Sequence, residues 1–217
     1  MKTRDRILHT SLILFNEEGE AGTTTVDIAN ELDISPGNLY YHFKGKDSIL
    51  AELFGQYEQS LGEILAAPVA GQLSVEDNWY YLYVVFEEMY NYRFLYHNLN
   101  NLIERYPDFQ KRFRRMMRMK ADAVKAVWEA LSQDAKVNAS SAEVAALVDN
   151  MVLLLTYWLT FSELRNESRD PSLIIHQGVH QLLSMIAPYL GDQQKAFYQQ
   201  VQRMLQTQTR SITSAAS

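Results

Sequence analysis

Residues 24–50 read TTVDIANELDISPGNLYYHFKGKDSIL, and start signals for two short helices lie within them. Thr24 and Asp27 have the spacing of a capping box, which opens a helix. Ser35 followed by Pro36 is an N-cap with proline at the first helical position, so a second helix is predicted to about residue 43. Only about three residues separate the two helices. Short helices joined so closely cross steeply, and the second can enter a DNA major groove about 12 Å wide.

The apolar positions of this region are predicted to hold the two helices against their neighbours; they are Val26, Ala29, Leu32, Ile34, Leu39 and Phe43. Between these positions the second helix carries small, hydrogen-bonding and aromatic residues: Pro36, Gly37, Asn38, Tyr40, Tyr41 and His42. A merely solvated helix face usually carries Glu and Lys instead. This composition favours a binding face.

Lys46 is predicted to lie in the first turn of the next helix, where the macrodipole favours anions over cations. A DNA phosphate between Lys46 and the free amides of that turn would remove this conflict. Lys44 lies two residues earlier. Both residues also fit the simpler interpretation of solvated loop lysines, and spacing alone does not decide between the two.

The same residues carry a resemblance. The run Leu39-Tyr40-Tyr41-His42-Phe43-Lys44-Gly45-Lys46, with Thr24 to Ala29 before it, resembles the DNA-binding domain of the TetR family of bacterial transcriptional regulators. The resemblance covers residues 4–50 and implies an all-α protein whose DNA contacts come from Thr25, Ser35, Gly37, Asn38, Tyr40, Tyr41, His42 and Lys46. Pro36, on the same helix face, and Lys44, beside Lys46, are predicted DNA contacts as well. Asp33 stands at the corner where the family often has glycine, so the turn is expected to place an Asp in a left-handed backbone.

Charge opposes strong DNA binding. Residues 1–60 hold 5 basic and 10 acidic side chains, a balance of −5, and the whole chain carries −6. Because counterion release supplies most non-specific affinity, we expect few phosphate contacts and a shallow dependence on salt.

The rest of the 217-residue chain is also predicted to be helical, over about 75–96, 100–105, 108–132, 141–164, 171–187 and 192–206. Pro68 and Gly71 suggest a boundary between a DNA-binding domain (1–66, with a linking helix 46–66) and an effector-binding and dimerisation domain (67–217). The tail 207–217 is expected to be disordered. The longest apolar stretch, 151–161, has 11 residues, short of the roughly 20 of a membrane span, so a soluble cytoplasmic protein with no membrane partner is expected.

An aromatic segment follows the linking helix. Tyrosine is a costly core residue unless its hydroxyl finds a partner, and six tyrosines lie between residues 80 and 96. Each aromatic taken alone fits a core; together they favour the wall of an effector cavity, where the resemblance also places one. The expected lining is Trp79, Tyr83, Phe86, Tyr90 and Phe94, with Met116, Met119, Tyr157, Trp158 and Phe161 opposite, and a flat, aromatic or long-chain effector is expected.

Lys111, Arg112, Arg114, Arg115, Arg118 and Lys120 form a basic run in the predicted helix 108–132. A solvated helix face is the simpler interpretation. The alternative is a site for the anionic group of an effector.

The helix predicted over 141–164 is apolar nearly all round, so it needs cover on two sides. Together with the next helix, in which Gly178 permits close approach, it is predicted to pair with its symmetry mate in a homodimer. The expected contact residues are Val148, Val152, Leu155, Ile174, Gly178, Leu182 and Ile186. A two-fold dimer of this kind reads a palindromic operator in double-stranded DNA.

No enzyme, cofactor or metal site is expected. Cysteine is absent, and glycine-rich phosphate loops are not found. His176 and His180 have the spacing of a metal pair, but two surface histidines are the simpler interpretation. The sequence therefore predicts a ligand-responsive, DNA-binding repressor. The alternatives are a DNA-bound protein-interaction factor without a small-molecule effector, and a helical enzyme that has lost DNA binding.

Overall fold

A computed structural model describes residues 2–67, 74–133, 135, 137, 139–165 and 170–215, with side chains described as far as residue 210. The described part of the chain is helical and contains no strand, which confirms the all-α prediction. The helices are α1 (Thr3–Glu18), α2 (Thr25–Glu31), α3 (Pro36–His42), α4 (Lys46–Leu65), α5 (Val75–Asn91), α6 (Phe94–His97), α7 (Leu99–Arg105), α8 (Pro107–Ser132), α9 (Ser141–Arg165), α10 (Pro171–Ile186) and α11 (Gln194–Ala215), with the 3-10 turns Ala187–Tyr189 and Gly191–Gln193 after α10.

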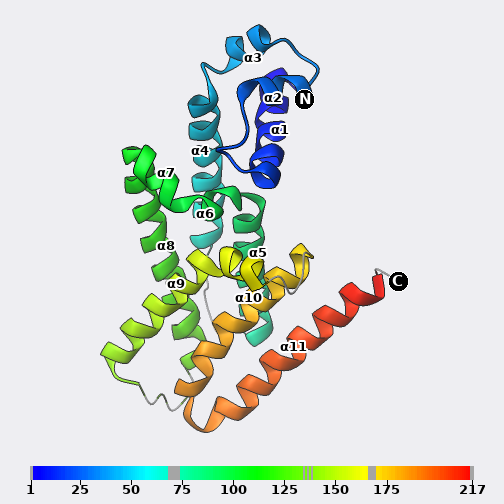
Figure 1. Ribbon diagram of the computed structural model, residues 1–217. Coiled ribbons are helices and arrows are strands. Elements are labelled where there is room, and N and C mark those ends of the chain that lie inside the picture. Colours follow the sequence, from blue (N-terminus) through cyan, green and yellow to red (C-terminus); the bar gives the residue numbers. More distant parts are fainter. Residues whose placement is uncertain are drawn as a thin grey trace.

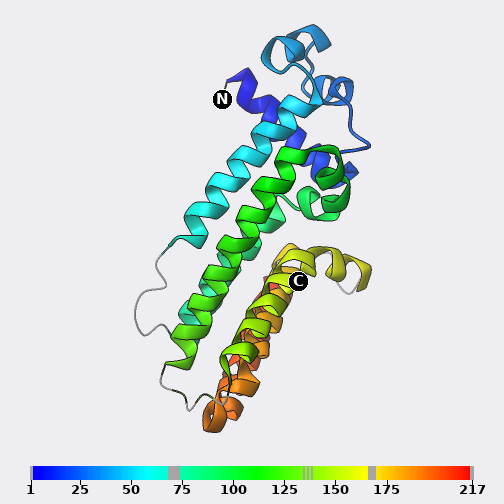
Figure 2. The same ribbon diagram turned by 90° about the vertical axis from the view of Figure 1, so that its left-hand side faces the viewer.

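The helices form an elongated molecule with α1 to α3 at one end and α9 to α11 at the other (Figure 1). Helix α4 leaves the α1–α3 unit and runs beside α8, which it contacts along the long axis (Figure 2). Helices α5, α9 and α11 all pack on α10. The proposed domain boundary at Pro68 and Gly71 lies outside the described residues.

One predicted helix is in fact two. The segment expected to run over 75–96 ends at Asn91, and the short helix α6 begins at Phe94. The side chain of Asn16, on α1, donates to the carbonyl of Asn91 at 2.8 Å and accepts from the amide of Phe94 at 3.1 Å. A side chain 75 or more residues away therefore satisfies the backbone at the break, and no local pattern could have shown it.

The prediction of a disordered tail was wrong for residues 207–215, because α11 continues to Ala215. The hydroxyls of Thr207 and Thr209 donate to the carbonyls of Arg203 and Leu205, four residues earlier, as side chains in a continuous helix can. Residues 216 and 217 lie outside the described part of the chain.

Helix α9 is long and apolar enough, by length and composition, to cross a membrane. A core helix passes the same test, and one side of α9 is buried in this fold: Leu147, Met151, Leu155 and Leu159 are covered by the helices packed around it. We therefore interpret α9 as a core helix of the larger domain.

Candidate functional site

The corner before α3 is built as the sequence predicts. The Thr24 side chain accepts from the amide of Asp27, and the Asp27 carboxylate accepts from Thr24, which completes the capping box. Asp33 has φ +54°, the only positive φ outside glycine in the described residues. Ser35 caps α3 by accepting from the amide of Asn38 at 3.2 Å. These local contacts fix where α3 starts and which way it points.

Helix α3 is attached through its apolar side and presents its other side to solvent. Leu39 and Phe43 are buried, together with Ile28 and Ala29 of α2. Val26, expected on the inner face, is instead 49% exposed, because it lies on the outer side of the first turn of α2.

The outward face of α3 holds most of the predicted DNA-contact residues. Ser35, Pro36, Gly37 and Asn38 are exposed, as are Tyr40 (58%) and Tyr41 (78%), while His42 and Thr25 are half-buried. Lys44 lies over the Tyr40 ring, 4.6 Å from its centroid, and is exposed. Helix α3 lies at the extreme end of the molecule in both views (Figures 1 and 2), where a partner as large as a duplex can approach it.

Lys46 has partners of its own. Its ammonium donates to the carbonyls of Glu20 at 2.7 Å and Thr23 at 3.1 Å, and it lies 3.1 Å from the Glu20 carboxylate. The Glu20 carboxylate and the two carbonyls therefore offset the unfavourable interaction of Lys46 with the helix dipole, and Lys46 is not a freely solvated loop lysine. A phosphate contact by Lys46 remains a prediction.

Glu20 also joins the two parts of the molecule. Its side chain is 1% exposed, and its carboxylate accepts from Arg105 at 3.1 Å as well as pairing with Lys46. The neighbouring Tyr106 donates to the carboxylate of Asp47 at 2.6 Å. The first turn of α4 is thus tied to the α7–α8 corner by two polar contacts.

The ten predicted effector residues lie in different environments within the described part of the chain. Trp79, Phe86, Phe94 and Met116 are buried, and Tyr83, Tyr90 and Met119 are half-buried. They face different neighbours: Trp79 donates to Nδ1 of His176 at 3.2 Å, whereas the Phe94 ring packs against Phe15 of α1. Much of the aromatic segment is therefore core, the simpler interpretation for its members taken one at a time.

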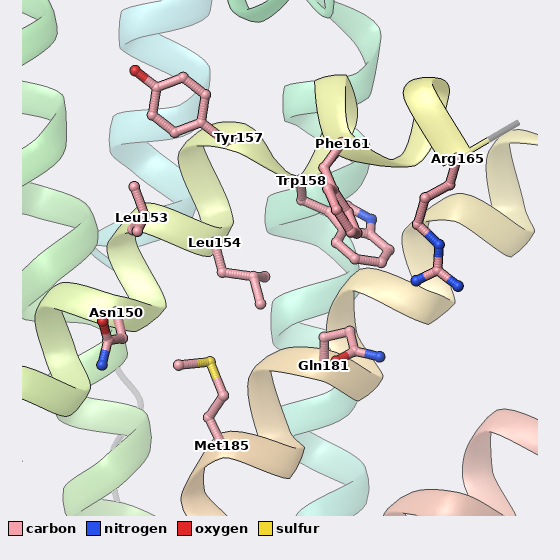
Figure 3. A pocket seen from close by; sticks show the side chains of 9 residues that line it. All are labelled: Asn150, Leu153, Leu154, Tyr157, Trp158, Phe161, Arg165, Gln181 and Met185. Carbon is pink, nitrogen blue, oxygen red and sulfur yellow. The ribbon is translucent and has the colours of Figure 1, made fainter.

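Tyr157, Trp158 and Phe161 line a different space, an open groove of about 470 Å³ on the outer side of α9 and α10. Figure 3 shows Leu154, Trp158 and Phe161 of α9 above Gln181 and Met185 of α10, with Arg165 at one end. Leu153 (57% exposed), Tyr157 (44%), Phe161 (50%) and Leu164 (80%) make this side of α9 an exposed apolar surface.

Most of the residues expected at the dimer face are covered within the protomer. Val152, Leu155, Gly178, Leu182 and Ile186 are buried within the protomer and offer no surface to a second copy, while Val148 and Ile174 are half-buried. Gly178 serves packing inside the chain: a Cβ there would lie 2.7 Å from the Trp158 indole nitrogen and 2.9 Å from the Phe86 ring. Helix α9 is apolar on two sides, and most of its predicted dimer residues lie on the side that is covered within the protomer.

The simpler interpretation placed His176 and His180 on the surface, but both are buried. His176 is 5% exposed and His180 is 8% exposed. Burial lowers the pKa of both imidazoles. His180 contacts the amide of Gln202 at 3.3 Å, so α11 covers it. Within the described ranges no group of three or more His, Cys, Asp or Glu side chains could hold a metal ion.

The basic run divides into three kinds of environment. Arg114, Arg115 and Arg118 are exposed, and Arg112 pairs with Glu58 of α4 at 2.7 Å. Lys120 is completely buried and donates to the Tyr96 hydroxyl at 2.8 Å. Burial lowers the pKa of Lys120 to about 7.

The sequence did contain a signal for Lys120. It falls on the buried stripe of α8 formed by Phe109, Phe113, Met116, Ala123, Val124 and Val127. A lysine at a core position of a helical stripe was overlooked because it ends a run of surface cations.

An exposed recognition helix on a steep helix-turn-helix corner, followed by a larger helical domain, defines a DNA-binding transcriptional regulator. Comparison with known families agrees. The family described as "Bacterial regulatory proteins, tetR family" matches residues 7–53, and the one described as "Bacterial transcriptional repressor" matches residues 56–198. The chain belongs to the TetR family of bacterial transcriptional regulators, whose members bind operator DNA and dimerise.

A crystal structure of a TetR-family transcriptional regulator from Marinobacter aquaeolei VT8 is similar over 96% of this chain and 99% of that one, with 31% identity and a TM-score of 0.82. Among curated proteins, the probable regulator YttP of Bacillus subtilis is 25% identical over 43% of this chain and 46% of its own length. IcaR of Staphylococcus aureus, the negative regulator of the biofilm operon icaADBC, is 43% identical over 27% of each chain. This chain thus matches about half of the first curated relative and about a quarter of the second.

Proposed function

We propose that this protein is a cytoplasmic repressor that binds a palindromic operator as a homodimer and is released from it by a small molecule. The observation that carries the DNA-binding part is the outward face of α3. Tyr40 and Tyr41 are exposed at the tip of the molecule beside the small residues of the first turn of α3. Apolar rings and small residues let a helix approach base edges and sugar closely, while hydroxyls and amides supply hydrogen bonds.

The charge balance gives this interface a particular character. Arg4 is paired with Glu52, and Lys46 is paired with Glu20, so two of the five cations in residues 1–60 already have internal partners. Few phosphates are then neutralised. Because each neutralised phosphate adds about −0.9 to the slope of log affinity against log salt, we expect a shallow slope.

Selection of duplexes from a random pool tests the proposal, followed by fluorescence anisotropy with the selected duplex. Replacing Tyr40 and Tyr41 together by alanine should cost about 1–3 kcal/mol of binding free energy. The matched control is Tyr80→Ala, because Tyr80 is 56% exposed but lies on α5. Full affinity in the double variant, or no sequence preference in the wild type, would contradict the DNA-binding proposal.

We propose that the dimer interface is formed by the outer side of α9 together with the groove between α9 and α10. Leu153, Tyr157 and Phe161 form a contiguous apolar surface, and such surfaces on soluble proteins mark interaction sites. An isologous contact through α9 and α10 would leave the two α3 helices free to read two half-sites.

Sedimentation analysis of Leu153→Glu tests this contact, since a carboxylate buried in a two-fold interface faces its own copy. Val84→Glu is the control, because Val84 is also exposed (42%) but lies on α5. If the Leu153→Glu variant remained a dimer, the interface would have to lie on another surface. A wild-type monomer that still selects DNA would favour the alternative, in which the groove docks another protein.

The proposed route from effector to DNA runs through α6 and α7. Helix α6 contacts α1 through Phe94, whose ring packs on Phe15 and whose amide donates to Oδ1 of Asn16; Nδ2 of Asn16 donates to the carbonyl of Asn91 at the end of α5. The next corner holds the start of α4 through Glu20 and Asp47. A ligand that displaces α6 or the start of α8 would therefore shift α1 and α4, and with them α3.

Linkage makes this route testable. If effector binding weakens operator binding by a given factor, the operator must weaken effector binding by the same factor. A thermal-shift screen would supply the effector, and its affinity would be measured with and without operator. Equal affinities would contradict the proposed coupling and leave the DNA-binding proposal standing.

A further inference from the structure

Lys120 lies in the interior where three helices meet. Its ammonium is 2.8 Å from the Tyr96 hydroxyl of α6 and 4.6 Å from the centroid of the same ring. Tyr96 in turn hydrogen-bonds Tyr57 of α4 through the two hydroxyls. All three side chains are at most 2% exposed. The chain Lys120–Tyr96–Tyr57 therefore crosses from α8 through α6 to α4.

The surroundings of this chain are apolar or aromatic. The centroid of the Phe113 ring lies 5.9 Å from the Lys120 ammonium. Met116 and Val124, one turn away on each side along α8, are buried. Among the described side chains no carboxylate lies within ion-pair distance of Lys120. Glu88 acts electrostatically on Tyr57 and Tyr96, and it hydrogen-bonds Ser60.

An ammonium in such a place is costly. Burial without a counter-charge disfavours the charged form, and a phenol hydroxyl uses only one of the three ammonium hydrogens. A methionine or leucine would pack at this position without that cost. An anion would accept hydrogen bonds from the remaining ammonium hydrogens and would supply the missing counter-charge.

We propose that Lys120 binds the anionic group of the effector, and that the effector is an amphipathic monocarboxylate whose apolar body lies among the side chains of α4, α6 and α8. This inference rests on the proposed ligand-responsive function. The carboxylate replaces the Tyr96 hydroxyl as the partner of Lys120, and the Lys120 side-chain amine takes up a proton from the solvent on binding.

Displacement of Tyr96 links the site to DNA. Tyr96 and Phe94 belong to the same four-residue helix, α6, and Phe94 packs on α1. A ligand carboxylate at Lys120 therefore acts on the element that contacts the DNA-binding unit. Arg114, Arg115 and Arg118 of the same helix are exposed to solvent instead.

The test compares carboxylates with alcohols of the same shape. Calorimetry would measure binding of decanoate and decanol, and of 4-phenylbutyrate and 4-phenylbutanol, to the full-length protein. At least one carboxylate should bind about tenfold or more tighter than its alcohol, since a hydrogen bond to a charged partner is worth about 1.5–3 kcal/mol. In Lys120→Met that preference should fall to about twofold or less, while the alcohol still binds.

The control is Lys125→Met, which removes an exposed lysine from the same helix and should keep the preference. A second readout is proton uptake. At about pH 8 the wild type should take up protons with the carboxylate, so the apparent enthalpy should differ between phosphate and Tris buffers. Lys120→Met should show no such difference.

The outcomes separate this inference from the proposed function. A carboxylate preference that survives in Lys120→Met, or binding without proton uptake, would overturn the role of Lys120 and leave effector control intact. Absence of any carboxylate preference in the wild type would overturn the ligand class. A carboxylate that binds through Lys120 without releasing operator DNA would support the site and contradict effector control.

Discussion

Replacing the buried Lys120 by methionine should change how stability depends on pH. Burial lowers the pKa of Lys120 from 10.5 to about 7. Between these values the unfolded chain holds a proton that the folded chain lacks, so wild-type stability rises with pH across that window. At 1.36 kcal/mol per pKa unit, the cost of the charged form is about 5 kcal/mol below pH 7 and vanishes above about pH 10.5.

Lys120→Met lacks this cost at every pH. It should therefore be more stable than the wild type at neutral pH, and its advantage should shrink by about 3 kcal/mol between about pH 7 and about pH 9.5. Urea unfolding of both proteins, at equal protomer concentration, would measure the two differences. Other titrating groups, such as the buried His176 and His180, are common to both proteins and cancel.

Lys125→Met is again the control, since an exposed lysine should give a difference that does not vary with pH in this range. A constant difference for Lys120→Met as well would show that Lys120 titrates normally in the folded protein. That result would also remove the reason for an anion at this position.

Three further changes test contacts that the structure shows. Gly178→Ala should destabilise the fold by about 1–3 kcal/mol, because its Cβ would lie under 3.0 Å from Trp158 and Phe86, whereas Gly55→Ala, with its nearest neighbour at 3.7 Å, should be neutral or stabilising; urea unfolding measures both. Glu20→Gln should destabilise by about 1–3 kcal/mol, because it leaves Lys46 without its charge partner; a variant as stable as the wild type would contradict this. Asn16→Ala should cost about 1–2 kcal/mol of stability for two lost hydrogen bonds and weaken the effector's influence on DNA binding, measured as the ratio of operator affinities with and without effector; an unchanged ratio would remove α6 from the route.

Local signals predicted the fold well. The capping box at Thr24, the N-cap at Ser35 and the left-handed corner at Asp33 all depend on contacts within a few residues, and all three are present. The helices α7 to α10 begin and end close to their predicted limits for the same reason. The break before α6 was missed because Asn16, which satisfies it, lies far away in the sequence.

Burial was harder to predict than helicity. Periodicity shows that a side of a helix is apolar, but α9 is apolar on both sides, and only packing decides which side faces α10. The predicted dimer residues of α9 lie mostly on its inner side, whereas Tyr157 and Phe161, predicted to bind the effector, lie exposed on its outer side beside the groove to α10. Polar residues on an apolar stripe, such as Lys120 and His176, were read by residue type and placed on the surface.

The Glu20 contact limits how the two parts of the molecule can move. Its carboxylate is almost completely buried and shared between Lys46 of the DNA-binding unit and Arg105 of the larger domain. If the α7–α8 corner moved alone, Glu20 would lose one of its two cationic partners, which is unfavourable for a buried carboxylate. The corner and the start of α4 are therefore favoured to move together. The α6–α1 contact imposes the same condition on α1, so under the proposed mechanism a displacement that begins at Tyr96 would be passed to α3 rather than absorbed at the junction.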